Sequence, residues 1–452
     1  MPIKIKPRKN NKKLASVIAE DISLETEQLL HQIEEKDQND VTTLAEKIVS
    51  ESAPPKTDKQ YQLNPLRIAL LSWESLHSIS IGGIGAHVTQ LAAALERQGH
   101  DVHVFTRKGW DSHDQYDCIH GVHYHRVPYH GHSDFIEDVN NMCRSFVSSL
   151  FKTEDYMGAH FDIVHAHDWL TSNAMVWIKE GKGRKCILTM HATEYGRCGN
   201  NFYGGPSACI RDHERHGTFC ADKVIAVSNA LKDEVMWMYN LPDWKVRSIH
   251  NGVNFHDFDY WCDPGGIKQR YGIGPVEPMI LFAGRMTSQK GPDILLDAIP
   301  HILKFYGNAK FVFAGDGDIR GAVEARAHQI GISHATRFLG QKNGRELKDL
   351  FKATDCVVVP SRNEPFGIVV LEAWSAGKPV VATVNGGPKE LIWNDVTGYN
   401  VHANPDSIAW GVGTLFANFE HARWMGNNGR RAAEEMFSWD NIANKTLDVY
   451  KS

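Results

Sequence analysis

The chain has no run of about 18 consecutive apolar residues, the length that a membrane-spanning helix needs, so we expect no integral membrane segment. Its first 13 residues are polar and basic, but no apolar core follows them, so a secretory signal is not expected. The eight cysteines are scattered without a CxxC pair, a pattern typical of a reducing compartment. These absences favour a cytoplasmic location.

An excess of basic residues is also missing. A formal net charge of −5 over 452 residues argues against a nucleic-acid partner. The sequence contains no GxSxG turn and no convincing Cys–His pairing, so we do not expect an enzymic nucleophile. Hydrophobic residues make up 42% of the chain, which is enough to form large cores, and the length predicts two or three domains.

Residues 1–62 differ from the rest of the chain, because they are polar and charged and end in a linker at residues 53–60. Two interpretations stay open. The segment is either a loosely docked extension or a helix through which the chain binds a partner or forms a homo-oligomer.

From residue 66 onward, short β-branched strands alternate with amphipathic helices. The first strand leads into Gly82-Gly83-Ile84-Gly85 and a helix, which is the order of a right-handed βαβ unit. Glycines there let backbone N–H groups approach a phosphate, although Val88 stands where the last glycine of a GxGxxG motif would be. The pattern predicts the α/β class with two Rossmann-like domains, residues 66–262 and 278–436, facing a cleft. We expect residues 437–452 to form a terminal helix that crosses back to the first domain.

Histidines follow two successive strands of the first predicted domain. His167 and His191 each stand at the carboxyl end of a strand, the edge at which open α/β sheets bind ligands. A structural role for either histidine stays open. Two further clusters, one of histidines between residues 113 and 132 and one of Cys and His between residues 198 and 220, lack zinc-ligand spacing, so we expect no metal site.

The stretch from residue 356 to 377 is the most informative part of the second domain. It reads as a buried strand, a loop and a helix that starts near Pro365, ends at Gly377 and is apolar apart from Glu372. Glu364 and Glu372 would lie roughly 12 Å apart along the helix axis, about the length of a sugar–diphosphate–ribose unit. Alternatively, Glu364 is a helix N-terminal charge and Glu372 pairs with a buried arginine.

Arg285 and Lys290 flank a loop that leads into another helix. Two cations beside a helix N-terminus are suited to bind a diphosphate.

Together these residues resemble those of a retaining glycosyltransferase of family 4, and His165-Ala-His-Asp-Trp169 looks most like the glycogen and starch synthase branch. The resemblance covers residues 66–450. It implies the GT-B fold, a nucleotide-sugar donor, a carbohydrate acceptor, and no metal or other cofactor. It also implies site roles. Arg285 and Lys290 would neutralise the leaving diphosphate, Glu372 would hold the ribose, Glu364 and His167 would contact the sugar, and the glycine loop would close over the phosphates. The donor-binding set would then be Gly83, Gly85, Arg285, Lys290, Phe366, Gly367, Ile368 and Glu372.

One position departs from this pattern. Many bacterial glycogen synthases have a lysine two residues before the paired glycines, where this chain has Ser80. The donor could therefore be a UDP- or an ADP-sugar, and the acceptor a glucan, a small molecule, a lipid or a protein. A sugar-nucleotide epimerase and a noncatalytic nucleotide-sugar-binding module remain as rival classes.

Overall fold

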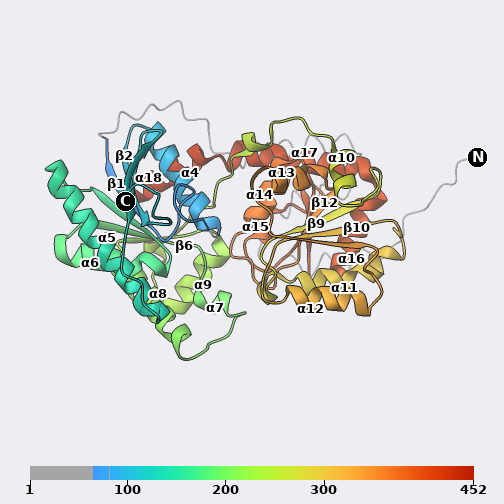
Figure 1. Ribbon diagram of the computed structural model, residues 1–452, viewed down its shortest axis with the longest axis horizontal. Helices are drawn as coiled ribbons and strands as arrows, with labels where there is room; N and C mark the ends of the chain where they lie inside the picture. Colours follow the sequence, from blue (N-terminus) through green and yellow to red (C-terminus); the bar gives the residue numbers. More distant parts are fainter. Residues whose placement is uncertain (1–64, 81) are drawn as a thin grey trace, which may run out of the picture. The chain divides into compact units, whose positions relative to one another are not determined.

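The computed structural model describes residues 65–80 and 82–452, and the predicted N-terminal extension, residues 1–62, lies outside the described residues. The α/β class expected from the sequence is confirmed: the described part contains two sheets, each covered by helices (Figure 1).

The first sheet has eight strands in the order β3-β4-β2-β1-β5-β6-β7-β8. All neighbours pair in parallel except β3 and β4, which form an antiparallel edge hairpin. The central strands are continuous apolar runs with both faces buried, as a parallel sheet requires. The strands are β1 (Arg67–Ser72), β2 (Asp101–Arg107), β3 (Tyr116–Ile119), β4 (Val122–Val127), β5 (Ile163–His167), β6 (Lys185–Met190), β7 (Lys223–Ala226) and β8 (Val246–Ser248).

Helices cover both faces of this sheet. α4 (Gly83–Arg97) and the terminal helix α18 (Trp439–Lys451) pack on one face, where Val88, Leu91, Ile442 and Leu447 belong to the same buried cluster. An ion pair of 2.6 Å between Arg97 and Asp440 also joins these two helices. The other helices of this half are α5 (Phe135–Met157), α6 (Trp169–Lys182), α7 (Glu194–Arg197), α8 (Pro206–Cys220) and α9 (Asn229–Tyr239).

The second sheet has six parallel strands in the order β11-β10-β9-β12-β13-β14. They are β9 (Met279–Ala283), β10 (Lys310–Ala314), β11 (Thr336–Gly340), β12 (Cys356–Val359), β13 (Val380–Thr383) and β14 (Gly398–Val401). The α11–α12–α16 side and the α10–α13–α14–α17 side cover opposite faces (Figure 1). These helices are α10 (Pro264–Arg270), α11 (Pro292–Leu303), α12 (Arg320–Gln329), α13 (Gly344–Ala353), α14 (Ile368–Ser375), α16 (Pro405–Ala417) and α17 (Phe419–Met436), and the single turn α15 (Pro388–Leu391) follows β13.

Two local expectations were wrong. The helix that carries Glu372 does not begin near Pro365: α14 begins at Ile368, because Gly367 before it has φ +98°, a left-handed conformation that a helix cannot contain. Glu364 therefore lies in a loop, and the helical spacing between Glu364 and Glu372 does not apply. The histidine cluster between residues 113 and 132, expected as a surface loop, is partly a strand, since His123 and His125 lie in β4 and pair with β2.

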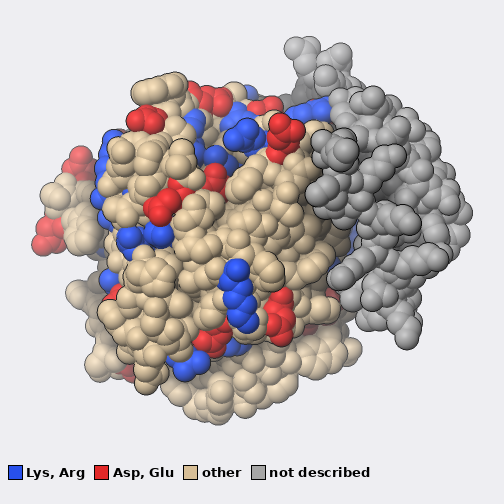
Figure 2. Space-filling view, turned by 90° about the vertical axis from the view of Figure 1, so that its right-hand side faces the viewer, with Lys and Arg blue, Asp and Glu red and all other residues tan. Residues whose placement is uncertain are grey.

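The surface shows no gathering of one charge on the face drawn in Figure 2, where basic and acidic side chains are interspersed among the described residues. No helix within residues 65–80 and 82–452 is long and apolar enough to cross a membrane.

Candidate functional site

Three histidines meet at the carboxyl edge of the first sheet. His167 ends β5, and its Nδ1 lies 3.2 Å from Nε2 of His191, which follows β6. His87 comes from α4, with its ring centroid 4.6 Å from that of His191 and 5.2 Å from that of His167. Asn251 fixes His87, because its Oδ1 lies 2.9 Å from His87 Nδ1 and accepts a hydrogen bond from it. The Nε2 atoms of His87 and His167 are buried and hydrogen-bond to no group in the described ranges.

Burial keeps these imidazoles neutral. It lowers the pKa of His87 and of His167 well below the usual value, with the neighbouring histidines adding to the effect, and it lowers the pKa of His191 to about 3. At neutral pH each ring therefore has one N–H donor and one acceptor nitrogen. Neutral rings can bind hydroxyl groups or a divalent cation, and the ligand atoms of the three side chains all lie within 4.8 Å of one another.

Asp168, which lies between β5 and α6, has a strained backbone conformation. Its backbone has φ 58° and ψ 177°, a region that non-glycine residues rarely adopt, and such strain costs about 1–3 kcal/mol. In return, its carboxylate accepts a 2.6 Å hydrogen bond from the His191 N–H, and Arg197 lies 3.8 Å away. Asp168 thus fixes the position of His191 relative to His167.

The glycine loop is already occupied by an anion from the protein itself. The Glu74 carboxylate accepts hydrogen bonds from the Gly82 N–H at 2.9 Å and from the Gly85 N–H at 3.0 Å. Glu74 thus takes up two N–H groups of the loop in the free protein, and the approach of a phosphate to this loop stays a prediction. Gly83 is exposed, and a Cβ there would have open space around it, so packing does not explain this glycine.

In the second domain, the structure brings Lys290 and Glu364 together. Lys290 Nζ donates to both carboxylate oxygens of Glu364, at 2.9 and 2.7 Å, and the Ser361 hydroxyl donates to Glu364 at 3.0 Å. Arg285, by contrast, is exposed, and its Nη2 lies 3.5 Å from Gln289 Oε1. One predicted cation is thus fixed in place and the other is accessible.

Close packing of backbone holds the loop that carries Glu364. A Cβ on Gly386, which has φ +103°, would lie 2.2 Å from the Glu364 carbonyl oxygen. A Cβ on Gly387 would lie 2.4 Å from the carbonyl oxygen of Phe366. Only glycine fits at these two positions, so the turn after β13 sets where Glu364 and Phe366 lie.

Glu372 lies in α14 with a half-buried side chain. Burial raises the pKa of its carboxyl to about 7, although the positive charge of Lys348 acts in the opposite direction. The alternative that Glu372 pairs with a buried arginine is wrong, because across residues 65–80 and 82–452 its carboxylate forms no hydrogen bond or ion pair. A half-buried carboxylate of this kind is suited to accept hydrogen bonds from ligand hydroxyls.

Loops of the two domains touch close to these groups. Asn363, next to Glu364, donates from Nδ2 to Asn200 Oδ1 at 2.9 Å, and the Ser228 hydroxyl donates to the Pro365 carbonyl at 2.6 Å. The Glu390 carboxylate accepts from the N–H groups of Asn229 and Ala230 at the start of α9, at 2.9 and 2.7 Å. The loop with Glu364 is therefore attached to the domain that carries the histidines.

Sequence reasoning missed the part that four residues play in this region. His87, Glu74 and Glu390 were not named, and Asp168 was named only within the motif His165-Ala-His-Asp-Trp169. They act through contacts between segments far apart in the chain, so local spacing gives no signal for Glu74 and Glu390, whereas His87 follows the glycine loop by two residues.

Comparison with known proteins identifies the family of the chain. A model of group 1 glycosyl transferases matches residues 266–432, and a model of glycosyltransferase family 4 matches residues 81–257. An uncharacterized glycosyltransferase of Methanocaldococcus jannaschii is 40% identical over 391 residues, which cover 85% of this chain and 98% of the relative. A D-inositol 3-phosphate glycosyltransferase of Xylanimonas cellulosilytica is 29% identical (82% and 91% covered), and a glycogen synthase of Mycobacterium tuberculosis is 28% identical (85% and 94% covered).

The fold has solved counterparts as well. Sucrose-phosphate synthase from Thermosynechococcus elongatus superimposes with a TM-score of 0.71 at 22% identity, over 85% of this chain and 98% of that chain. The expected GT-B architecture and the family resemblance are both confirmed. With two family models on successive domains and a relative 40% identical over nearly its full length, the chain belongs to the group 1 and family 4 glycosyltransferases.

Proposed function

We propose that this glycosyltransferase is a cytosolic, retaining hexosyltransferase that moves a hexose, with glucose as the first candidate, from a UDP- or ADP-sugar to a glucan hydroxyl. The observation that carries the proposal is the Lys290–Glu364 pair, with the accessible Arg285 five residues before Lys290 in the loop after β9. A sugar ring on Glu364 and a diphosphate between the two cations would place the bond to be broken at this point.

The cations would act on the leaving group. When the bond between the sugar C1 and the phosphate oxygen breaks, its electron pair goes to the diphosphate, which gains negative charge. Arg285 and Lys290 would stabilise that charge, and one such interaction typically lowers the activation barrier by about 3 kcal/mol. Since the protein supplies these cations, we propose that no metal ion or other cofactor is required.

Backbone groups and Glu372 would hold the rest of the donor. The first N–H groups of α14, near Phe366, Gly367 and Ile368, lack partners within the helix and favour an anion. Glu372 would accept hydrogen bonds from the ribose hydroxyls. Gly83 and Gly85 would lie over the phosphates once the donor displaces the Glu74 carboxylate, which accepts from the Gly82 and Gly85 N–H groups in the free protein. The open space at Gly83 supports this role, because nothing in the protein itself requires a glycine there.

The neutral histidines suit binding rather than proton transfer. Because the pKa of His167 lies well below its usual value, its imidazole is a poor base at neutral pH. We propose that His167 contacts a hydroxyl of the transferred sugar. Because the Nε2 atoms of His167 and His87 are buried in the free protein, this contact requires the surrounding side chains to move when the donor binds. The acceptor oxygen then forms a bond to C1, and its proton passes to a phosphate oxygen of the departing diphosphate.

An aromatic cluster supports a carbohydrate acceptor. The rings of Tyr195, Phe202 and Trp237 lie 4.8 to 6.3 Å apart, and Phe202 and Trp237 are more than half exposed. They border Asn200, which contacts the loop that carries Glu364. Aromatic faces offer apolar area at low entropic cost, and sugar rings can lie against them.

A small acceptor is the second candidate. Ser80 in place of the usual lysine favours it, and so does the similarity to a D-inositol 3-phosphate glycosyltransferase. An epimerase is less favoured, because it would need no acceptor and would leave the aromatic cluster without a role.

Product analysis tests the proposal. The enzyme is incubated with UDP- or ADP-glucose, EDTA and maltotriose, and the new linkage is assigned by proton NMR. We expect an α-linked product, which retains the configuration of the donor. A β-linked product would refute retention, and a free sugar epimer formed without acceptor would establish the rival class.

A further inference from the structure

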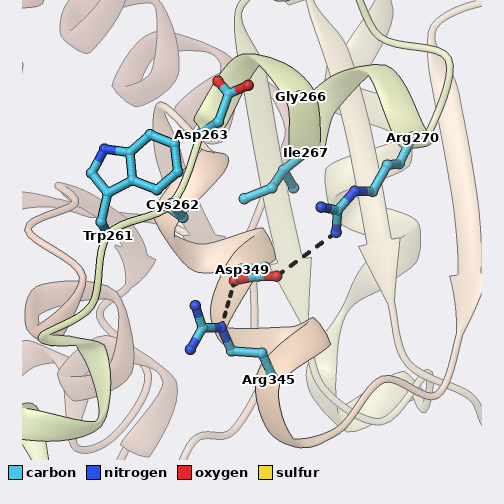
Figure 3. A pocket seen from close by; sticks show the side chains of 8 residues that line it. All are labelled: Trp261, Cys262, Asp263, Gly266, Ile267, Arg270, Arg345 and Asp349. Atoms are coloured by element: carbon cyan, nitrogen blue, oxygen red, sulfur yellow. Dashed lines mark hydrogen bonds and ion pairs between the residues drawn. The ribbon is translucent and has the colours of Figure 1, made fainter.

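A cavity of about 350 Å³ lies between α10 and α13 in the second domain, and none of its lining residues belongs to the candidate site (Figure 3). The residues that matter for its chemistry are Trp261, Asp263, Ile267, Arg270, Arg345 and Asp349.

Asp349 organises the polar part of this cavity. Its carboxylate accepts hydrogen bonds from the Tyr260 hydroxyl at 2.9 Å and from Arg345 Nε at 3.1 Å, and Arg270 Nη1 lies 3.9 Å away. Figure 3 shows the contacts of Asp349 with Arg345 and Arg270. The Arg345 guanidinium also lies 3.1 Å above the centre of the Tyr260 ring. These contacts fix donors and acceptors before any ligand arrives, which lowers the entropic cost of binding.

Trp261 supplies an apolar surface at the rim. The side chain is 85% exposed, and the buried Ile267 lines the cavity beside it. An indole left in water gains little from folding, but it offers a large rigid face to a ligand. The cavity thus combines one flat apolar face with several fixed hydrogen-bonding groups.

The charges decide which class of ligand fits. The lining contains two guanidinium groups, Arg270 and Arg345, and two carboxylates, Asp263 and Asp349, so the formal charges cancel. A phosphate or another anion would gain from the arginines but would be repelled by the two carboxylates. A neutral molecule with many hydroxyls can donate to the carboxylates and accept from the guanidinium groups at the same time.

We propose that this cavity binds a neutral oligosaccharide, with one sugar ring against Trp261 and its hydroxyls on Arg270, Arg345 and Asp349. The ligand class follows from the cavity alone, whereas the identification of the ligand as the acceptor glucan rests on the proposed function. A glucan attached here would remain near the transferase at a raised local concentration, because two contacts on one polymer reinforce each other.

Affinity electrophoresis through a gel that contains glycogen tests this site separately from catalysis. We expect the wild-type chain to be retarded and Trp261→Ala to bind glycogen about tenfold more weakly. Trp244→Ala, which removes another exposed tryptophan (60% exposed) that does not line the cavity and lies against Lys223 of β7, is the matched control and should be retarded like the wild type. Arg270→Gln changes an exposed arginine and should also weaken retardation. Turnover with maltotriose, which is too short to need a second contact, should be unchanged in both cavity variants.

The outcomes test the oligosaccharide site independently of the proposed transferase function. Retardation that disappears in Trp261→Ala supports the site even when no donor sugar is transferred to glycogen. Equal retardation of Trp261→Ala and the wild type overturns the site even when transfer is observed, and so does the absence of wild-type retardation. Inorganic phosphate that binds to the wild type but not to Arg270→Gln would also overturn it, because the cavity would then be an anion site.

Discussion

Burial sets the protonation of the residues at the proposed site. The imidazoles of His87, His167 and His191 stay neutral, so they can offer hydrogen bonds to sugar hydroxyls without carrying a charge into the protein interior. Glu364 differs from these rings, because Lys290 provides the opposite charge within hydrogen-bonding distance. A donor that binds here would meet neutral groups on one domain and a matched ion pair on the other.

Glu372 leads to a prediction on pH dependence. Its carboxyl has a pKa of about 7 in the folded chain, whereas an unfolded glutamate has a pKa of about 4.3. Between these values the folded state binds more protons, so the stability that this group contributes is fully present below about pH 4 and is lost as the pH rises through 7. We expect Glu372→Gln, which cannot ionise, to gain in melting temperature relative to the wild type between pH 5.5 and pH 8.

The same variant tests the ribose assignment. A neutral amide accepts hydrogen bonds more weakly than a carboxylate, so we expect UDP or ADP to bind about tenfold more weakly to Glu372→Gln at pH 8. Calorimetric titration at pH 8 measures this difference. Unchanged nucleotide affinity would remove Glu372 from the donor site, and a melting-temperature difference that does not vary with pH would contradict the raised pKa.

At the scale of elements, two turns contain a glycine for different physical reasons. Gly386 is required by packing, since its φ is +103° and an added Cβ would lie 2.2 Å from the Glu364 carbonyl oxygen. Gly83 begins α4 and has no neighbour within 4 Å of an added Cβ. The first turn positions a loop of the protein, whereas the second leaves room for something outside the protein.

We therefore expect different effects when each of these two glycines is replaced by alanine. Gly386→Ala should lower the free energy of unfolding by about 1–3 kcal/mol, because a non-glycine residue is strained at positive φ. Gly83→Ala should fold as the wild type does but lose about ten- to a hundredfold in kcat/KM for the donor, as a misplaced phosphate would cause. Denaturant titration and donor kinetics on both variants measure these effects. A Gly83→Ala variant with wild-type kinetics would contradict the role of the loop.

Much of the element pattern could be predicted from the sequence, because buried parallel strands and amphipathic helices leave strong local periodicities. The strand expected at the start of the stretch from residue 356 is β12, which begins at Cys356, and the terminal helix expected over residues 437–452 is α18, Trp439–Lys451. The start of α14 was not predicted, since the left-handed Gly367 depends on its fit against Pro388 and Val370, which no local pattern records. The β3–β4 hairpin was missed because its residues look like those of a polar loop.

The candidate site was less predictable than the fold. Motif residues such as Lys290 and Glu364 could be named, but their pairing in the free protein could not, because 74 positions separate them in the chain. The strain at Asp168 and the binding of Glu74 to the glycine loop depend likewise on tertiary contacts. Sequence spacing identifies which groups are present, while packing decides which of them meet.

At the scale of the whole molecule, Glu390 connects the two α/β domains. Its carboxylate accepts from two N–H groups at the start of α9 and from His250 Nε2 at 3.1 Å. These hydrogen bonds lower the pKa of Glu390 despite its burial. Loops on both domains supply the candidate site, so this contact joins the two domains beside it.

We expect Glu390→Gln to change kcat and the donor KM together, each by a few-fold, because the variant alters domain contacts rather than the reacting groups. Its free energy of unfolding should fall by about 1 kcal/mol, the typical effect of losing a charge at a helix N-terminus, and the melting temperature should fall accordingly. Glu420→Gln, in the exposed first turn of α17, is the matched control: it also removes a charge near a helix N-terminus and can lower the melting temperature, but it should leave kcat and the donor KM unchanged. An effect on kcat alone would argue against the connection between domains.

The most direct test of the central proposal is nucleotide release from UDP- and ADP-sugars in the presence of EDTA, with glycogen, maltose or no acceptor, for the wild type and Arg285→Ala. We predict release from one donor that depends on the glucan and falls by about 10²- to 10³-fold in Arg285→Ala. Arg326→Ala, on the exposed side of α12, serves as the control and should keep wild-type rates. Release that requires a divalent metal, or an equal rate in wild type and Arg285→Ala, would contradict metal-independent transfer through this cation.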